Sequence, residues 1–404
     1  NINEAVLRFL LDKDANQNKI MSIGLLSIGT MIVVATCAYP LLKLYKPIAD
    51  YSVYVLCYII SSGCNTVFLY NLRGKELLLR FSIGNIINAL CVALSNILFL
   101  LHFDMGLKGY FLAYIIANFI TTVYSFFAGD VFSTIRHFSF DKPLMLAMIK
   151  YSIVLIPNSF MWWVMDSSNR LLLTSLSGIA VSGMYAVAAK LPSLVSVVST
   201  IFNQAWNYSA IKERDSEDSL AYNNSVFDFL ITVVIGISSV ILLLLKPFMS
   251  IYVEPAYYEA WKYTPPLIVG AVFLVLATFL ASSYTVHKDS RGFLYSSLIG
   301  AAANIILNII LIPHLAASGA ALATCMSYVA VFVFRFFNTK KYLKLSVFTA
   351  KHIIELACLF VAAIAVYLGN IGYIIIACEL LVLIIIAREN IRSVLHAVLK
   401  ILKK

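Results

Sequence analysis

Residues 151–170 read YSIVLIPNSFMWWVMDSSNR, a run apolar enough to enter a bilayer that nevertheless carries ionic and amide side chains. Asn158, Trp162, Asp166 and Arg170 recur at every fourth residue, so on a helix they form one slowly drifting stripe. Each ionic group at the centre of a membrane helix costs about 2.5–3.5 kcal/mol. Such residues persist where they face a partner, a bundle interior or a water-filled cavity. We expect this stripe to face a cavity at membrane depth.

The composition predicts a membrane protein. The 404 residues are 61% hydrophobic and 12% charged, whereas soluble domains are about 45–50% apolar and about 25% charged. Ordinary packing cannot hide this much apolar surface from water, so we predict a polytopic membrane protein. The net charge of +10 comes from basic residues spread over short loops between apolar runs, which is typical of membrane orientation. We therefore expect no nucleic-acid partner.

A membrane helix needs about 20 apolar residues. Reading with that window predicts an all-α fold of twelve spans, near residues 20–42, 51–71, 81–101, 108–128, 147–176, 184–208, 225–245, 263–285, 293–313, 319–337, 350–368 and 371–388. Most of the 30 Lys and Arg residues, Arg335 among them, lie on one set of alternating loops and the adjoining helix ends, which places that side and both ends of this chain in the cytoplasm.

An internal repeat predicts two related bundles. Each copy has a basic turn, an Asn-bearing span and a returning span that begins with small residues, so that Gly109 matches Gly319 and Ala113 matches Ala323. Both copies cross the membrane in the same direction, so an axis along the membrane normal relates two pseudo-symmetric bundles around a central cavity. We predict an N-terminal bundle over residues 1–135, a C-terminal bundle over 136–345, and two extra helices with a basic amphipathic tail over 346–404.

Patterns for catalysis and metal binding are weak. The six His and seven Cys residues show no metal-ligand spacing, and most carboxylates sit in loops. No long soluble segment is present to hold an ATPase or a transferase. We expect no enzyme activity, no metal ion and no cofactor.

Arg170 and Asp166 are the main site candidates, with Asn158, Trp162 and Trp163 beside them. The fork of an arginine suits phosphate or carboxylate, so Arg170 would bind an anion inside a cavity. Asp166 would orient the Arg170 side chain, and the tryptophans would stack on sugar rings. The alternative is a self-satisfied ion pair at i,i+4, with the tryptophans marking the membrane interface. Intramembrane charge favours the functional interpretation.

The next span adds further candidates. Lys190 is an isolated ammonium that either joins Arg170 in the cavity or reaches the membrane interface along its own stem. Asn203, Gln204 and Trp206 close the same span on the predicted cytoplasmic side. They form either a cytoplasmic gate or an interfacial belt.

Three runs carry a resemblance to a known family. The sequences IPNSFMWWVMDSSNR (156–170), GIAVSGMYAVAAKLP (178–192) and IFNQAWNYSAI (201–211) resemble the bacterial polysaccharide transporters. These are the O-antigen and capsule flippases (Wzx-type) of the multidrug/oligosaccharidyl-lipid/polysaccharide (MOP) superfamily. The resemblance implies about fourteen helices in two bundles, with two helices that would precede this chain.

The resemblance also implies a function. Such proteins move undecaprenyl-diphosphate-linked oligosaccharide from the cytoplasmic to the outer leaflet of the bacterial inner membrane by alternating access. Arg170 and Lys190 would attract the diphosphate or an acidic sugar. In many relatives Asp occupies the place of Asn169, whereas here the acid is Asp166, and proton or sodium coupling stays open.

Partners and rival functions follow from the same resemblance. The partners would be the polyprenyl-diphosphate-linked oligosaccharide, membrane lipids, and a polysaccharide polymerase with its chain-length regulator. One alternative is a multidrug antiporter of the same superfamily, whose cationic substrates favour acidic cavities. Another is a non-transporting membrane subunit of a polysaccharide assembly complex.

Overall fold

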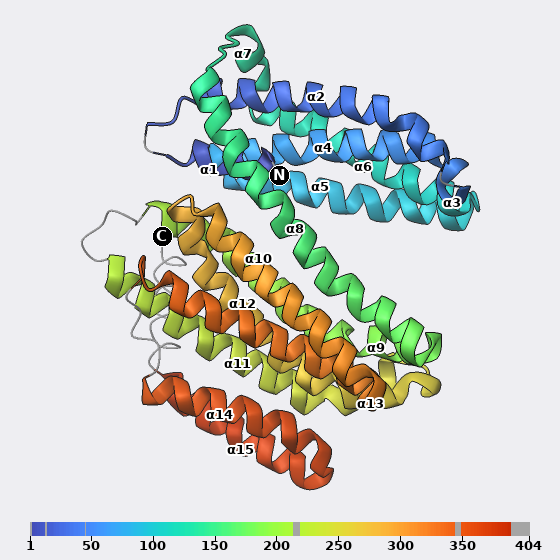
Figure 1. The fold of residues 1–404 in the computed structure, drawn as a ribbon, viewed down its shortest axis with the longest axis vertical. Coiled ribbons are helices and arrows are strands. Elements are labelled where there is room, and N and C mark those ends of the chain that lie inside the picture. The colour runs from blue at the N-terminus through green and yellow to red at the C-terminus, as the bar shows by residue number, and fades with distance from the viewer. Residues whose placement is uncertain (1, 13, 45, 213–218, 344–348, 389–404) are drawn as a thin grey trace, which may run out of the picture. The chain divides into compact units, whose positions relative to one another are not determined.

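The computed structural model describes residues 2–12, 14–44, 46–212, 219–343 and 349–388. Over these ranges the fold is all α, with short π-helical and 3-10 segments and no strand (Figure 1). The predicted all-α class is confirmed. The predicted amphipathic tail lies outside the described residues.

The helices have the length and composition of membrane spans. In the described part of the chain, nine helices are long and apolar enough to cross a membrane, and the bent pair α9 (Ile179–Ala188) and α10 (Lys190–Lys212) makes a tenth. All twelve predicted spans fall on helices. The count is lower because α13 (Ser290–Thr339) holds two predicted spans and α15 (Asn370–Ile386) has only 17 residues.

The first compact unit covers residues 1–156. Its helices are α1 (Ile2–Leu10), α2 (Gln17–Leu44), α3 (Lys46–Ala49), α4 (Ser52–Gly74), α5 (Leu78–Asn96), α6 (Gly106–Ala128), α7 (Val131–Arg136) and the first half of α8 (Lys142–Ser177). Helix α6 packs against both α4 and α5, and a π-helical turn over Ile97–His102 extends α5. Short α1 is buried along Ala5 and Val6 and packs on α4 and α2.

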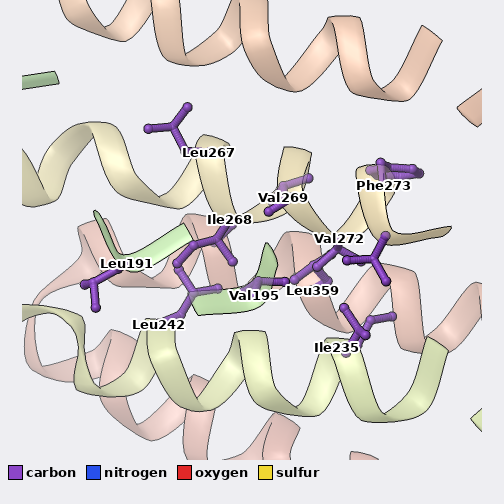
Figure 2. Packing of buried hydrophobic residues seen from close by; sticks show 14 of the residues in the cluster. Leu191, Val195, Ile235, Leu242, Leu267, Ile268, Val269, Val272, Phe273 and Leu359 are labelled. Carbon is purple, nitrogen blue, oxygen red and sulfur yellow. The ribbon is translucent and has the colours of Figure 1, made fainter. Parts of the chain in front are cut away.

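The second compact unit begins at residue 157. It contains the rest of α8, then α9, α10, α11 (Ser219–Tyr252), α12 (Thr264–Val286), α13, α14 (Ala350–Ala365) and α15. Helix α12 is apolar on every face and almost wholly buried, as expected for a helix covered on all sides. Figure 2 shows its core residues Ile268 and Val272 together with Val195 of α10, Ile235 of α11 and Leu359 of α14.

Helix α13 contains a break that divides it into two spans. Ala316 has φ 48° and ψ −125°, outside helical geometry. Just after it, Gly319 begins the returning half, and a Cβ there would lie 2.4 Å from a backbone carbonyl oxygen. Gly109 occupies the matching place at the start of α6, where a Cβ would lie 3.1 Å from a carbonyl oxygen. Ala113 and Ala323 are both fully buried, so the matched small residues allow close helix approach in both copies.

The two units divide inside α8, between Ile156 and Pro157, and the domain boundary at residue 135 stays a prediction. Helix α8 is continuous through this point, and its first half packs on unit 1. The Tyr151 ring, for example, lies 6.3 Å from the ring of Phe9 in α1. Helices α14 and α15 cluster with the second unit.

Candidate functional site on helix α8

A buried amide cluster fixes the rotation of α8 in the second unit. Asn169 is buried, and its Oδ1 accepts hydrogen bonds from Asn308 Nδ2 at 2.7 Å and Asn304 Nδ2 at 3.3 Å, both on α13. Ser168 donates to Asn304 Oδ1 at 2.8 Å. Successive residues of a helix differ by about 100°, so anchoring Asn169 on α13 turns Arg170 toward the open side of α8.

The first unit has an amide cluster of its own. Asn118 Oδ1 accepts from Asn65 Nδ2 and from Asn88 Nδ2, each at 3.2 Å, and Asn88 also reaches Thr121 Oγ1 at 3.2 Å. Asn88 and Asn304 lie in the two Asn-bearing spans of the predicted repeat, and each comes four residues after a buried glycine. Both clusters join helices through hydrogen bonds between neutral groups, so they bury no charge.

Asp166 and Arg170 do not pair with each other. Both side chains are exposed, and among the described residues no ion pair or hydrogen bond joins either one to a partner. Their charges lie within electrostatic range of the Tyr185 hydroxyl on α9. The self-satisfied ion pair is therefore not formed, and the Arg170 guanidinium has all of its donors available.

The stripe drifts from the bundle interior to the open side of α8. Asn158 and Trp162, at its start, are half-buried, and the Trp162 ring lies 6.3 Å from the ring of Tyr328. Trp163, by contrast, is 59% exposed and stacks on Phe160 with ring centres 5.7 Å apart. Trp163 is therefore the tryptophan that offers an aromatic face beside Arg170, whereas Trp162 packs inward.

Arg335 is a residue that sequence reasoning placed with the cytoplasmic basic residues. It is 2% exposed, and its guanidinium donates to Ser296 Oγ at 3.0 Å and to the Ala277 carbonyl oxygen at 2.9 Å. The same guanidinium lies 5.7 Å from the ring centre of Trp162 and 5.9 Å from that of Phe293. Arg335 thus holds Trp162 in place by a cation–π contact. One feature of the sequence does indicate that Arg335 is buried: Arg335 lies inside the last apolar run of α13 and not after it.

Lys190 begins α10, directly after the break that bends α9 and α10 by 42°. Its side chain is exposed and makes no ion pair with any described residue. Its carbonyl oxygen accepts from Ser193 Oγ at 2.5 Å. Lys190 is therefore a free ammonium at a break in a membrane span, as its isolation in the sequence indicated.

Two of the three predicted gate residues are packed in the second unit. Trp206 is 3% exposed, stacks on Phe279 with ring centres 4.8 Å apart, and donates from Nε1 to Ser282 Oγ at 2.9 Å. Asn203 is buried and donates to Ser199 of its own helix. The side chain of Gln204 lies outside the described part of the structure. Trp206 thus packs in the core of the bundle, and the cytoplasmic gate and the interfacial belt stay predictions.

Metal-binding groups are not gathered anywhere in the described ranges. No set of three His, Cys, Asp or Glu side chains is close enough to hold a metal ion there. The cysteines of these ranges are all free thiols. Helix α8 offers a ligand a guanidinium, a carboxylate and an exposed indole, and Lys190 at the start of α10 offers an ammonium.

The sequence matches no protein-family model and no curated protein. Solved structures do share its fold. A MATE transporter in the bent conformation matches with a TM-score of 0.73 at 10% identity, over 90% of this chain and 84% of that chain. A mutant of a Vibrio cholerae MATE transporter matches with a TM-score of 0.68 at 13% identity, over 84% and 85% of the two chains.

A third solved structure is a MOP superfamily transporter from Pyrococcus furiosus, for which reverse polarity of the binding pocket suggests a different function. It matches with a TM-score of 0.69 at 13% identity, over 84% of this chain and 83% of that chain. At such low identity the likeness concerns the fold alone. The chain thus has the two-bundle fold of MATE transporters of the MOP superfamily, built from helices that span a membrane several times.

Proposed function

We propose that this chain is a flippase. It moves undecaprenyl-diphosphate-linked oligosaccharide, the repeat unit of an O-antigen, capsule or exopolysaccharide, from the cytoplasmic to the outer leaflet of the bacterial inner membrane by alternating access. The observation that carries the proposal is Arg170, an exposed guanidinium on a helix long and apolar enough to cross a membrane, with no carboxylate paired to it among the described residues. An arginine kept in a membrane helix without a protein partner marks an anion's path, and its fork fits a diphosphate.

Two further side chains suit the same ligand. Lys190 adds a second unpaired cation, located at the helix break beside α9. Trp163 presents an exposed aromatic face on the same side of α8 as Arg170, and an indole stacks readily on the apolar face of a sugar ring. The diphosphate and glycan would occupy a water-filled cavity, while the polyprenyl tail stays in lipid. Asp166 is the acid we nominate on α8 for coupling to a proton or sodium gradient.

A multidrug antiporter is the second candidate, because one of the structural neighbours is a multidrug resistance MATE transporter. The positive charge of the candidate site argues against a multidrug antiporter. Cationic drugs need acidic cavities, whereas α8 and α10 present Arg170 and Lys190 with only Asp166 to oppose them. Drug susceptibility of a deletion strain separates the two, since a flippase mutant keeps its resistance and loses its glycan.

A non-transporting subunit of a polysaccharide assembly complex is the third candidate. It predicts that lipid-linked precursor still reaches the outer leaflet in a deletion strain. Our proposal predicts that radiolabelled precursor accumulates on the inner leaflet. The proposal also places both chain ends in the cytoplasm, with the polymerase and chain-length regulator as partners on the outer side.

The test is Arg170→Ala in a strain that depends on this protein for surface glycan. One charge-assisted hydrogen bond is worth about 1.5–3 kcal/mol, so we expect surface glycan to fall roughly 10- to 100-fold. Arg170→Lys keeps the charge without the fork and should give an intermediate level. The matched control is Lys150→Ala, which removes an exposed cation earlier on the same helix. Wild-type glycan in Arg170→Ala, at equal protein in the membrane, would remove Arg170 from the site.

A further inference from the structure

Helix α11 meets α14 and α15 along a line of polar side chains that we call the acid seam. Its members are Asp228, Thr232 and Ser239 of α11, Lys351, His352 and Glu355 of α14, and Glu379 of α15. At one end, both carboxylate oxygens of Asp228 accept from Lys351 Nζ at 2.7 Å, and Asp228 Oδ1 lies 3.0 Å from His352 Nε2. The Asp228 and Lys351 side chains are 29% and 26% exposed, so water reaches this end of the seam.

Glu355 lies one step deeper and is 0% exposed. Its Oε1 is 2.5 Å from Thr232 Oγ1, which in turn lies 2.9 Å from the Asp228 carbonyl oxygen. A threonine hydroxyl has one proton to donate. If Thr232 gives that proton to the backbone carbonyl, the contact with Glu355 is a hydrogen bond only when Glu355 is the acid and donates. With Glu355 protonated, Glu355 Oε1 donates to Thr232 Oγ1 and Thr232 Oγ1 donates to the Asp228 carbonyl oxygen, so all three oxygens are hydrogen-bonded at once.

No cation balances a charge on Glu355. Lys351 is bound by both oxygens of Asp228, so that pair is already neutral. His352 also acts electrostatically on Glu355, but it is hydrogen-bonded to Asp228. Among the described residues, no cation forms an ion pair with Glu355, and its Oε2 is buried without a hydrogen bond. An ionised carboxylate here would be a bare charge in a desolvated site, which proteins avoid by neutralising the group.

Glu379 repeats this arrangement farther along the seam. It is 6% exposed, its Oε1 accepts from Ser239 Oγ at 2.8 Å, and its Oε2 is buried without a partner. Thr232 and Ser239 are seven residues apart on α11, which corresponds to about 10 Å along the helix. Two buried acids, each with one hydroxyl contact and one open oxygen, therefore lie in line from the exposed end inward.

The groups that face the two acids are few. Lys351, His352 and Asp228 act electrostatically on Glu355, and Cys358 lies within range of both acids. Helix α12 also packs on α14, but there it presents apolar surface such as Phe273 against Phe360. His352 Nδ1 is a further buried atom without a partner, next to Glu355 on the same helix.

We propose that the acid seam is a reversible proton-binding site, with Glu355 and Glu379 as the groups that carry the protons. Each carboxylate takes up one proton from water that enters at Asp228 and Lys351, and each acid returns that proton when the seam is more exposed; no other reactant is needed. The proposal that these two acids bind protons does not depend on the proposed flippase function. The use of these protons to drive transport rests on that function.

Infrared spectroscopy of the whole chain in lipid tests proton binding directly, with the proton itself as the probe. We expect a carboxylic-acid carbonyl band at pH 7 that disappears as the pH is raised. Glu355→Gln and Glu379→Gln should each remove the intensity of one carboxyl group, and the double variant should remove both. Glutamine keeps the size and the hydrogen-bonding ability of the neutral acid, so the fold is preserved. Glu259→Gln, at an exposed carboxylate paired with Lys262, is the matched control and should leave the band unchanged.

Two results would overturn the proposal. One is the absence of an acid band in the wild-type protein at pH 7, which needs no variant to interpret. The other is a band that both glutamine variants leave intact. Coupling is measured separately, by surface glycan in the same variants. Loss of glycan with loss of the band supports proton-driven transport, whereas a wild-type protein that exports no glycan refutes the proposed flippase and leaves the infrared result standing.

Discussion

The second unit carries two groups of intramembrane charges, and they are built in opposite ways. Asp166 and Arg170 are one helical turn apart on α8, are exposed, and make no ion pair with any described residue. Asp228 and Lys351 are 123 residues apart and form a two-oxygen salt bridge at 2.7 Å, with Glu355 buried beside them. The fold therefore pairs and partly buries the second group (the closed group), whereas it leaves the first group (the open group) exposed and without an ion pair to any described residue.

The largest stability effect should come from the closed group. Asp228→Ala leaves Lys351 and His352 without their shared acceptor. Removing one partner of a fully buried pair costs about 3–5 kcal/mol, and since a quarter of each side chain stays exposed here, we expect about 2–3 kcal/mol. Thermal unfolding of the purified protein in detergent measures this change.

A double-mutant cycle with Lys351→Ala provides the control for that experiment. If the pair is the cause, the double variant should recover part of the loss, because no unpaired ammonium is left. Strictly additive losses would mean that Asp228 and Lys351 act independently and that the closed group is not held by this salt bridge.

The next largest loss of stability should come from removing the amide acceptor in either of the two neutral clusters, one in each unit. Asn169→Ala removes the acceptor for two amides of α13, and Asn118→Ala removes the acceptor for Asn65 and Asn88. Leaving buried donors unsatisfied costs about 1–3 kcal/mol. Hydrogen exchange should show faster opening of α8 and α13 in the first variant and of α4, α5 and α6 in the second. Equal exchange in both variants would contradict separate clusters.

The smallest stability effect should come from the open group. Arg170→Ala removes an exposed side chain with no described partner, so the free energy of unfolding should change by no more than about 0.5 kcal/mol. The same variant should lose export, which separates a ligand contact from a packing contact. A loss of about 2 kcal/mol, matching that of Asp228→Ala, would show that Arg170 supports the fold.

Much of the fold follows from the sequence because membrane insertion depends on local properties. A window of about 20 apolar residues locates a span, and every predicted span lies on a helix. The stripe on α8 also follows from the sequence, since helical periodicity alone makes residues at every fourth position drift around the helix axis. Its drift is what brings Arg170 to the open side while Trp162 packs inward.

What the sequence did not reveal are the contacts between distant helices. Hydropathy gives the depth of a residue but not which helix its face meets. Arg335, read as part of a basic cytoplasmic set, is buried against Trp162 because α13 meets α8 there. The sequence likewise gives no sign of the contacts of Asp228 and Glu355, since their partners lie more than a hundred residues away.

Transbilayer movement of the substrate is the most direct measurement. Purified protein is reconstituted into liposomes that carry fluorescent undecaprenyl-diphosphate oligosaccharide, and the fraction of glycan accessible from outside is followed over time. We predict that the wild-type protein moves the lipid across, that Arg170→Ala remains at the rate of empty liposomes, and that Lys150→Ala matches the wild type. Movement in Arg170→Ala at the wild-type rate, or none in the wild type, would contradict a flippase built around this arginine.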